Sequence, residues 1–235
     1  MYFGMFYDPT FMLLIPAIIL SIYAQSKVNS TYRRFAGMRN RKGITGAEAA
    51  RRILDANGLT GIPIEVSRGR LSDHYDPKNR VMRLSQDVFN QNSIASVSIA
   101  AHESGHAIQH LKNYTPLVVR NVIAVPVNVI SMASWPLMIL GIVIIQMGYR
   151  AGGNLIFDIG ILAFVAVVLF HLITLPVELN ASKRAMEELK KENIIFNEEA
   201  IGARKVLSAA ALTYVAALAV AVAQLVRLLV IRGRD

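Results

Sequence analysis

Two histidines and a glutamate carry the strongest chemical signal in this 235-residue sequence. They belong to the run HESGH, from His102 to His106, which matches the pattern H-E-x-x-H. Residues four apart lie on one face of a helix, so both imidazoles can bind one metal ion, with Glu103 beside them. Zinc lowers the pKa of water toward neutrality, and a carboxylate can take its proton. The run therefore predicts a zinc-dependent hydrolase site, with His102 and His106 as zinc ligands and Glu103 as catalytic base.

The surroundings of this run favour a buried helix. A helix is predicted over residues 92–111, and the neighbours of the run are apolar: Ile99, Ala100, Ala101, Ala107 and Ile108. The alternative is that two surface histidines and a glutamate share an exposed helix. Buried His and Glu side chains need polar partners, and a metal ion would satisfy that need.

Two histidines leave a zinc site one protein ligand short. Glu178 is the strongest candidate, because a glutamate from a separate downstream helix completes a His₂Glu site. The alternative is that Glu178 only begins a helix after Pro176, where a negative charge suits the helix dipole. His110 continues the four-residue spacing, but eight residues of helix rise about 12 Å, which is too far for the same metal.

Other polar residues are weaker candidates for the third ligand. His74 lies in a predicted hairpin, where it would face solvent or a substrate groove. His171 lies in an apolar stretch, where an ionisable residue is either functional or bonded to a neighbouring helix. Three further glutamates lie in a Lys-rich segment and are predicted to be solvated: Glu187, Glu188 and Glu192.

The composition indicates an integral membrane protein. The chain is 54% hydrophobic and its mean hydropathy is +0.41, which is too apolar for an ordinary soluble domain. It contains no Cys, which excludes disulfides and thiolate metal sites. The net charge of +9 is interpreted as membrane topology rather than as nucleic-acid binding, because the basic residues sit beside apolar spans.

Four apolar stretches are each near the length that crosses a bilayer, about 20 residues. They cover residues 10–24, 122–147, 155–177 and 206–231. The first lacks preceding Lys or Arg and is predicted to be a retained anchor rather than a cleaved signal peptide. Twenty-one of the 25 Lys and Arg residues fall within 24–121 and 176–205, which predicts that both segments are cytoplasmic.

The last apolar stretch fits this topology least well. Three arginines, Arg227, Arg232 and Arg234, fall at its C-terminal end, on the side where few positive charges are expected. The stretch is therefore predicted either to cross the membrane or to be re-entrant or peripheral.

A polar module separates the first two spans. Thr45 and Glu48 form a capping-box pattern that predicts a helix over 46–56. A strand is predicted over 62–67, and a turn at 76–79 is flanked by the arms of a hairpin, 71–75 and 80–84.

The predicted fold class is mainly α, a multi-span helical membrane bundle with a small α+β zincin-like module. Its expected parts are an anchor (1–24), the cytoplasmic module (25–117) and the bundle (118–235), in which a cytoplasmic helix over 178–205 supplies the third ligand.

Three segments of this sequence are similar to one protein family. They are LSDHYDP from Leu71, RLS from Arg83 and AHESGHAIQ from Ala101. They resemble the YugP-like family of bacterial membrane zinc metallopeptidases, the neutral zinc peptidases, and the resemblance covers nearly the whole chain. It implies a zinc ion on His102 and His106, one per chain, with Glu103 catalytic, in the inner membrane of a bacterial cell.

The chain departs from a related pattern at one position. Many gluzincins, the metallopeptidases with a downstream glutamate ligand, place an Asp four residues after that glutamate to orient a ligand histidine. Here the position is Ser182. The resemblance therefore transfers the role of Glu178 more firmly than the roles of the residues around it.

The predicted reaction is hydrolysis of peptide bonds near the cytoplasmic membrane surface, in peptides or membrane proteins. Tyr75 and His74 are the candidates for contacting the substrate or the transition state. The strand over 80–84 would pair with substrate backbone if it edges the cleft, and would otherwise be an ordinary hairpin arm. Two alternatives stay open: a catalytically silent zinc scaffold or chaperone, and a transporter with polar points at Asp158, His171 and Arg227.

Overall fold

The computed structural model describes residues 9–69 and 72–233. These residues form two compact units. The apolar unit comprises residues 9–23, 119–175 and 214–233, and the polar unit comprises 24–69, 72–118 and 176–213.

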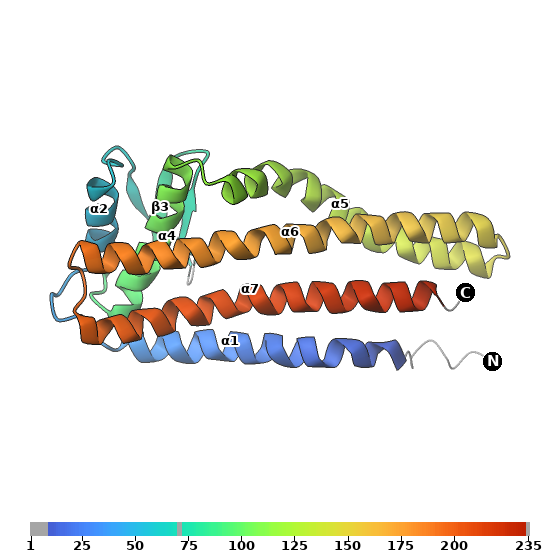
Figure 1. Ribbon diagram of the computed structural model, residues 1–235, viewed down its shortest axis with the longest axis horizontal. Coiled ribbons are helices and arrows are strands. Elements are labelled where there is room, and N and C mark those ends of the chain that lie inside the picture. Colours follow the sequence, from blue (N-terminus) through green and yellow to red (C-terminus); the bar gives the residue numbers. More distant parts are fainter. Residues whose placement is uncertain (1–8, 70–71, 234–235) are drawn as a thin grey trace. The chain divides into compact units, whose positions relative to one another are not determined.

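Four long helices run through the described residues (Figure 1). They are α1 (Ile15–Ala36, preceded by the 3₁₀ turn η1, Pro9–Leu14), α5 (Thr115–Gln146), α6 (Arg150–Lys191) and α7 (Asn197–Arg232). Each is long and apolar enough to cross a membrane. The four predicted spans are therefore confirmed as apolar helices of sufficient length.

The bounds of α6 and α7 differ from those predicted, because both helices extend beyond the apolar spans. Residues 178–205 do not form one helix, since α6 ends at Lys191 and α7 begins at Asn197. Helix α6 also runs straight through Pro176, so the interpretation of Glu178 as a residue that begins a helix is wrong. Helix α7 is unbroken, and no re-entrant turn interrupts it.

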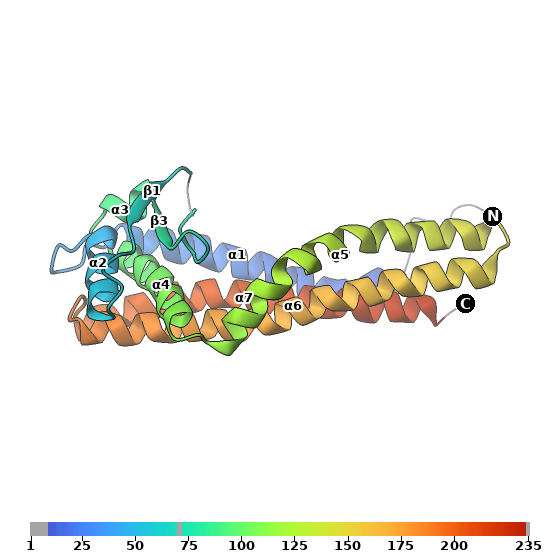
Figure 2. The same ribbon diagram turned by 90° about the horizontal axis from the view of Figure 1, so that it is seen from above.

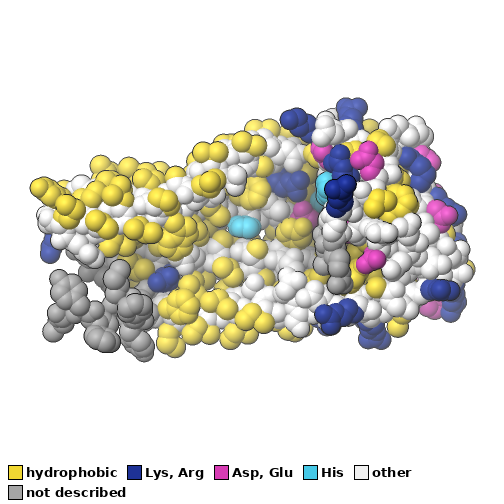
Figure 3. Space-filling model, turned by 180° about the vertical axis from the view of Figure 1, so that it is seen from behind, with side chains coloured by type: hydrophobic (Ala, Val, Ile, Leu, Met, Phe, Trp, Pro, Cys, Tyr) yellow, Lys and Arg dark blue, Asp and Glu magenta, His cyan; other side chains and the backbone are white. Residues whose placement is uncertain are grey.

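The apolar unit exposes large hydrophobic side chains. Val122, Val125 and Leu162 are at least 70% exposed, as suits a surface that faces lipid. Its small buried core consists of Met138, Phe157, Ile161, Phe164 and Leu228. Figure 3 shows mostly hydrophobic side chains over this unit and charged side chains over the polar unit.

The polar unit combines short helices with a three-stranded sheet (Figure 2). Its helices are α2 (Gly46–Ala56), α3 (Gln86–Asn90) and α4 (Ile94–Leu111), and its strands are β1 (Ile64–Ser67), β2 (His74–Asp76) and β3 (Val81–Ser85). The capping box at Thr45 and Glu48 is present, which confirms the predicted helix. The mainly helical class with a small sheet is confirmed.

The order of the strands is β1-β3-β2. Strands β2 and β3 form the predicted antiparallel hairpin, and β1 pairs parallel with β3. The predicted strand over 80–84 is therefore central. The alternative in which it edges a cleft is wrong, and the alternative of an ordinary hairpin arm is confirmed. Its backbone groups are used by β1 and β2, which leaves β2 as the edge on the hairpin side.

Candidate metal centre

Helix α4 positions the H-E-x-x-H run. It begins after Ser93, whose side chain accepts a hydrogen bond from the Ser96 N–H. Most of the helix is buried, including Ala100, Ala101, Ala107 and Ile108, as the apolar neighbours predicted. The burial fixes which face carries His102, Glu103 and His106.

The structure brings His102 and His106 together with Glu178, which lies on α6. The His102 Nε2 atom lies 3.2 Å from the Glu178 Oε2 atom, and the His106 Nε2 atom lies 3.4 Å from it. The histidine side chains are 13% exposed and the glutamate side chain is 4% exposed. Water can therefore reach the imidazoles, while the carboxylate is almost enclosed.

This donor set fits a zinc ion. Zinc lies about 2.0–2.2 Å from N and O ligands in tetrahedral sites, so two ligand atoms lie roughly 3.3 Å apart. The distances to Glu178 match that spacing, and all three ligand atoms lie within 4.8 Å of one another. With no Cys in the chain, two imidazoles and a carboxylate form a set that suits zinc.

A close approach between α4 and α6 makes this meeting possible. A Cβ atom at Gly105 would lie 2.6 Å from the carbonyl oxygen of Ala181. Only glycine fits without a shift of backbone. Gly105 is one of the two variable positions of the H-E-x-x-H run, so the run itself contains the residue that admits the helix carrying Glu178.

The second nitrogen of each imidazole has a neutral partner. The Nδ1 atom of His102 lies 3.2 Å from the Ser182 hydroxyl, and that of His106 lies 3.0 Å from the Gln109 Oε1 atom. The Gln109 amide donates to the Val177 carbonyl (2.8 Å) and to the Asn180 side chain (3.0 Å). These contacts leave both Nε2 atoms to face Glu178.

Ser182 thus contacts a candidate ligand histidine from a position four residues after Glu178. Gln109 and Asn180 were missed in the sequence analysis. The available signal for Gln109 was its position three residues after His106, on the same helix face.

The carboxylates govern the charge of the site. Burial alone would lower the pKa of His106, but the Glu178 and Glu103 carboxylates outweigh burial and raise that pKa. A site that stabilises positive charge on an imidazole also suits a cation in the same place.

Glu103 faces the sheet and is 8% exposed. Its Oε2 atom accepts a hydrogen bond from the Tyr75 N–H (3.0 Å). Because Tyr75 lies on β2, the free edge of this strand is directed toward Glu103. The carboxylate is therefore held by one backbone donor on the α4 face next to the histidines.

The neighbouring Asp73 fastens the hairpin to the start of α3. Its carboxylate accepts hydrogen bonds from the Ser85 N–H (2.7 Å) and hydroxyl (3.0 Å). Burial raises the pKa of Asp73, the Ser85 bonds oppose the rise, and the Glu103 charge adds to it. Asp73 thus places the strand that carries Tyr75 against Glu103.

Sequence comparison agrees with this geometry. A family profile described as "Putative neutral zinc metallopeptidase" matches residues 10–233. The chain belongs to this family. It is also 48% identical over 225 residues to the "Putative membrane protease YugP" of Bacillus subtilis (strain 168), covering 95% of this chain and 97% of that protein. No solved structure matches the chain.

The family name and the four apolar helices together indicate a membrane protein of the zinc metallopeptidase class. Within this member of the family, His102, His106 and Glu178 form the candidate metal site among the described residues.

The remaining predicted site residues lie around the cluster or apart from it. His74 is exposed, and its Nδ1 atom lies 2.8 Å from the Ser72 carbonyl oxygen. The Tyr75 hydroxyl contacts His110 Nδ1 (2.9 Å), and burial raises the pKa of Tyr75. His110 is therefore outside the ligand set, as the helix rise required. His171 belongs to the apolar unit.

Proposed function

We propose that this chain is an integral membrane zinc endopeptidase of the gluzincin type, with a zincin-like module in its polar unit. His102, His106 and Glu178 would hold one zinc ion, and Glu103 would act as general base. The observation that carries this proposal is the convergence of both Nε2 atoms on the Glu178 carboxylate, with Glu103 on the same helix.

The residues of the chain divide the work of hydrolysis. A bound zinc ion would polarise the substrate carbonyl and make water more acidic. Glu103 takes a proton from the attacking water as its oxygen bonds to the carbonyl carbon, and then delivers a proton to the leaving amine as the C–N bond breaks. Ser182 and Gln109 hold the imidazoles, and the Tyr75 N–H holds Glu103.

The edge of β2 supplies a way to align a peptide. Successive residues of an edge strand direct their backbone groups alternately inward and outward. The Tyr75 N–H points outward and is used by Glu103, so a substrate strand on β2 would pair with the outward Tyr75 carbonyl and run past the catalytic carboxylate. Tyr75 and His74 are the proposed substrate contacts, and the backbone groups of Tyr75 point outward from the edge of β2.

The charge distribution supports a cytoplasmic site near the membrane surface. Twenty-one of 25 basic residues lie in 24–121 and 176–205, which contain all three proposed ligands. A helix of 42 residues is about 63 Å long, whereas a bilayer core is about 30 Å thick. Helix α6 therefore extends beyond the core, and Glu178 directly follows its apolar stretch. We infer peptide or membrane-protein substrates next to the inner membrane of a bacterium.

The test compares Glu103→Gln with wild type for cleavage of a mixed peptide library and for bound zinc. Loss of a general base lowers the rate by about 10²–10⁴-fold, and zinc content is expected to be unchanged. Glu187→Gln is the matched control, because Glu187 is exposed on α6 and pairs with Lys183. Equal cleavage by Glu103→Gln would reject the proposed chemistry and favour a zinc scaffold.

A further inference from the structure

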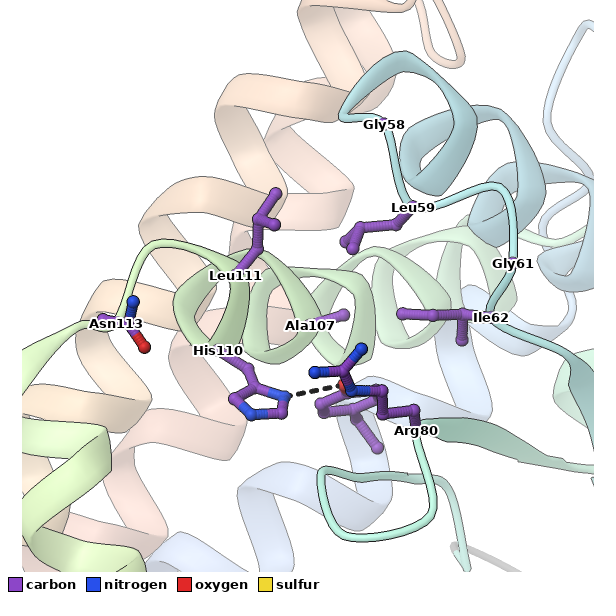
Figure 4. Close-up of a pocket in the computed structure, with 10 residues that line it drawn as sticks. Gly58, Leu59, Gly61, Ile62, Arg80, Ala107, His110, Leu111 and Asn113 are labelled. Carbon is purple, nitrogen blue, oxygen red and sulfur yellow. Dashed lines mark hydrogen bonds between the residues drawn. The ribbon is translucent and has the colours of Figure 1, made fainter.

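A cavity of about 390 Å³ lies at the C-terminal half of α4. Its walls come from α4, the hairpin and the loop after α2, and include Leu59, Ile62, Tyr75, Arg80, Ala107 and His110. Figure 4 labels Arg80 and His110, which both line this cavity. The cavity therefore combines apolar walls with a guanidinium and an imidazole.

The cavity adjoins the proposed catalytic base. Glu103, Ala107 and His110 are spaced i, i+4 and i+7, so they lie along one face of α4. Tyr75 contacts both ends of this face, since its N–H donates to Glu103 and its hydroxyl contacts His110. A peptide that reaches Glu103 along β2 would thus have the cavity beside it.

Arg80 is the unusual residue of this wall. Its φ angle is +51°, a left-handed conformation that glycine and asparagine adopt more readily than arginine. Its guanidinium makes no hydrogen bond or ion pair with the described residues, although its charge is felt by the Tyr75 hydroxyl. The position thus carries an exposed cation, without a partner among the described residues, where a turn alone would favour glycine.

The walls are fixed before any ligand arrives. The Arg51 guanidinium donates to the carbonyl oxygens of Ile62 (2.7 Å) and Leu59 (2.9 Å), which holds the loop after α2. The Asp76 carboxylate accepts from the N–H groups of Lys78 (3.0 Å) and Asn79 (3.1 Å), which holds the turn that ends at Arg80. Hydrogen bonds to Asn79, above all, lower the pKa of Asp76 to about 2. The backbone of these walls therefore needs little reordering on binding.

We propose that this cavity is a substrate subsite that recognises a carboxylate, with Arg80 as the specificity-determining residue. This inference rests on the proposed peptidase function, because it assigns the preferred substrate class of the same site. A guanidinium pairs with a carboxylate through charge-assisted hydrogen bonds, and Tyr75 and His110 offer further polar groups. The carboxylate belongs either to an acidic side chain or to the C-terminus of a peptide.

Binding of labelled peptides tests the inference without requiring cleavage. Full-length Glu103→Gln protein in nanodiscs with zinc is titrated with three Ala-rich peptides, followed by fluorescence anisotropy. One has a central Glu and an amidated end, the second has Gln and an amidated end, and the third has Gln and a free carboxyl end. We expect the Glu peptide, the free-acid peptide or both to bind about tenfold tighter than the Gln amide.

Arg80→Gly is the decisive variant, because glycine accepts the left-handed angle and the turn should fold at least as well. It should reduce the ratio of affinities, carboxylate peptide to Gln amide peptide, to about one. Lys78→Gly, in the same turn but outside the cavity, should retain it. An unchanged preference in Arg80→Gly would overturn the subsite. Equal binding of all three peptides, or no binding, by the protein that retains Arg80 would also overturn it.

Peptide cleavage is measured separately, with protein that retains Glu103. The peptidase proposal and the subsite proposal can therefore fail independently. Lys78→Gly, which lies outside the cavity, should still cleave the Gln amide peptide. If the wild type cleaves none of the peptides, the peptidase proposal fails while the binding ratios still decide the subsite.

Discussion

The apolar and polar units are built on different principles. In the apolar unit, large side chains such as Val125 and Leu162 are exposed, and an ion pair joins Asp158 to Arg232. In the polar unit, each residue of the proposed site contacts a specific partner, as Gln109 contacts His106. The exposed surface of the first unit depends on composition, whereas the proposed site of the second depends on individual contacts. Helix α6 takes part in both, through 150–175 and 176–191.

The largest effect is expected at the helix contact of the polar unit. Gly105→Ala places a methyl group against the backbone of Ala181, so α4 and α6 must separate and the ligands move apart. We expect a loss of about 1–3 kcal/mol of stability together with loss of bound zinc. Thermal unfolding and zinc content measure both effects.

Gly152→Ala is the matched control in the apolar unit. Gly152 is also helical, but a Cβ atom there would meet nothing within 4 Å. The substitution should be neutral or slightly stabilising, because alanine is the better helix former. An equal loss of stability and zinc from both substitutions would show that the close helix contact at Gly105 is not the cause.

Removal of zinc should also act on one unit only. A ligand at 100 times its dissociation constant stabilises the folded state by about 2.7 kcal/mol, which is roughly a 100-fold change in opening. Treatment with a chelator should therefore speed amide hydrogen exchange in α4 and in residues 176–191, but not in residues 119–146. Uniform acceleration throughout the chain would contradict a local metal site.

Smaller effects are expected from the residues that hold the imidazoles. Gln109→Ala and Ser182→Ala remove the partners of His106 and His102, and losses of this kind lower zinc affinity about 10–100-fold. Ser182→Asp should restore or strengthen binding, because a carboxylate makes the imidazole more basic. Competition with a zinc-sensitive dye measures the affinities. Unaltered affinity in both alanine variants would show that these contacts only accompany the site.

The smallest effect is expected in the apolar unit. Asp158→Asn removes a partly exposed ion pair with Arg232, and such pairs contribute about 0–1 kcal/mol. Zinc content and peptide cleavage should stay within twofold of wild type. A large loss of either would support a functional role for polar residues of this unit, as the transporter alternative requires.

Much of the fold could be predicted from the sequence because its signals are local. Hydropathy located the four long helices, and Thr45 with Glu48 located the start of α2. The turn residues after Asp76 located the hairpin. Each signal lies within the segment it predicts.

The errors arose where a distant segment decides the outcome. Strand β3 became central because β1 pairs with it, and this contact is not local. Pro176 usually signals the end of a helix, yet α6 continues through it.

The residues of the site also fall into those with a local sequence signal and those that depend on a distant segment. The i, i+4 spacing identified His102 and His106, and the end of an apolar stretch identified Glu178, so the proposed ligands could be found from the sequence. The partners Gln109 and Ser182 depend on how α4 meets α6 at Gly105, and the cavity beside Arg80 depends on how three segments meet. A single sequence contains no direct signal for such meetings.

In the proposed site, one zinc ion is held jointly by α4 and α6. The most direct measurement is the zinc content of purified wild type, Glu178→Ala, Glu178→Gln and Glu103→Gln, each checked for folding by circular dichroism. We expect about one zinc per chain in wild type and Glu103→Gln, and a large loss in folded Glu178→Ala, with Glu178→Gln at or below wild type. Full zinc content in folded Glu178→Ala would show that α6 supplies no zinc ligand through Glu178.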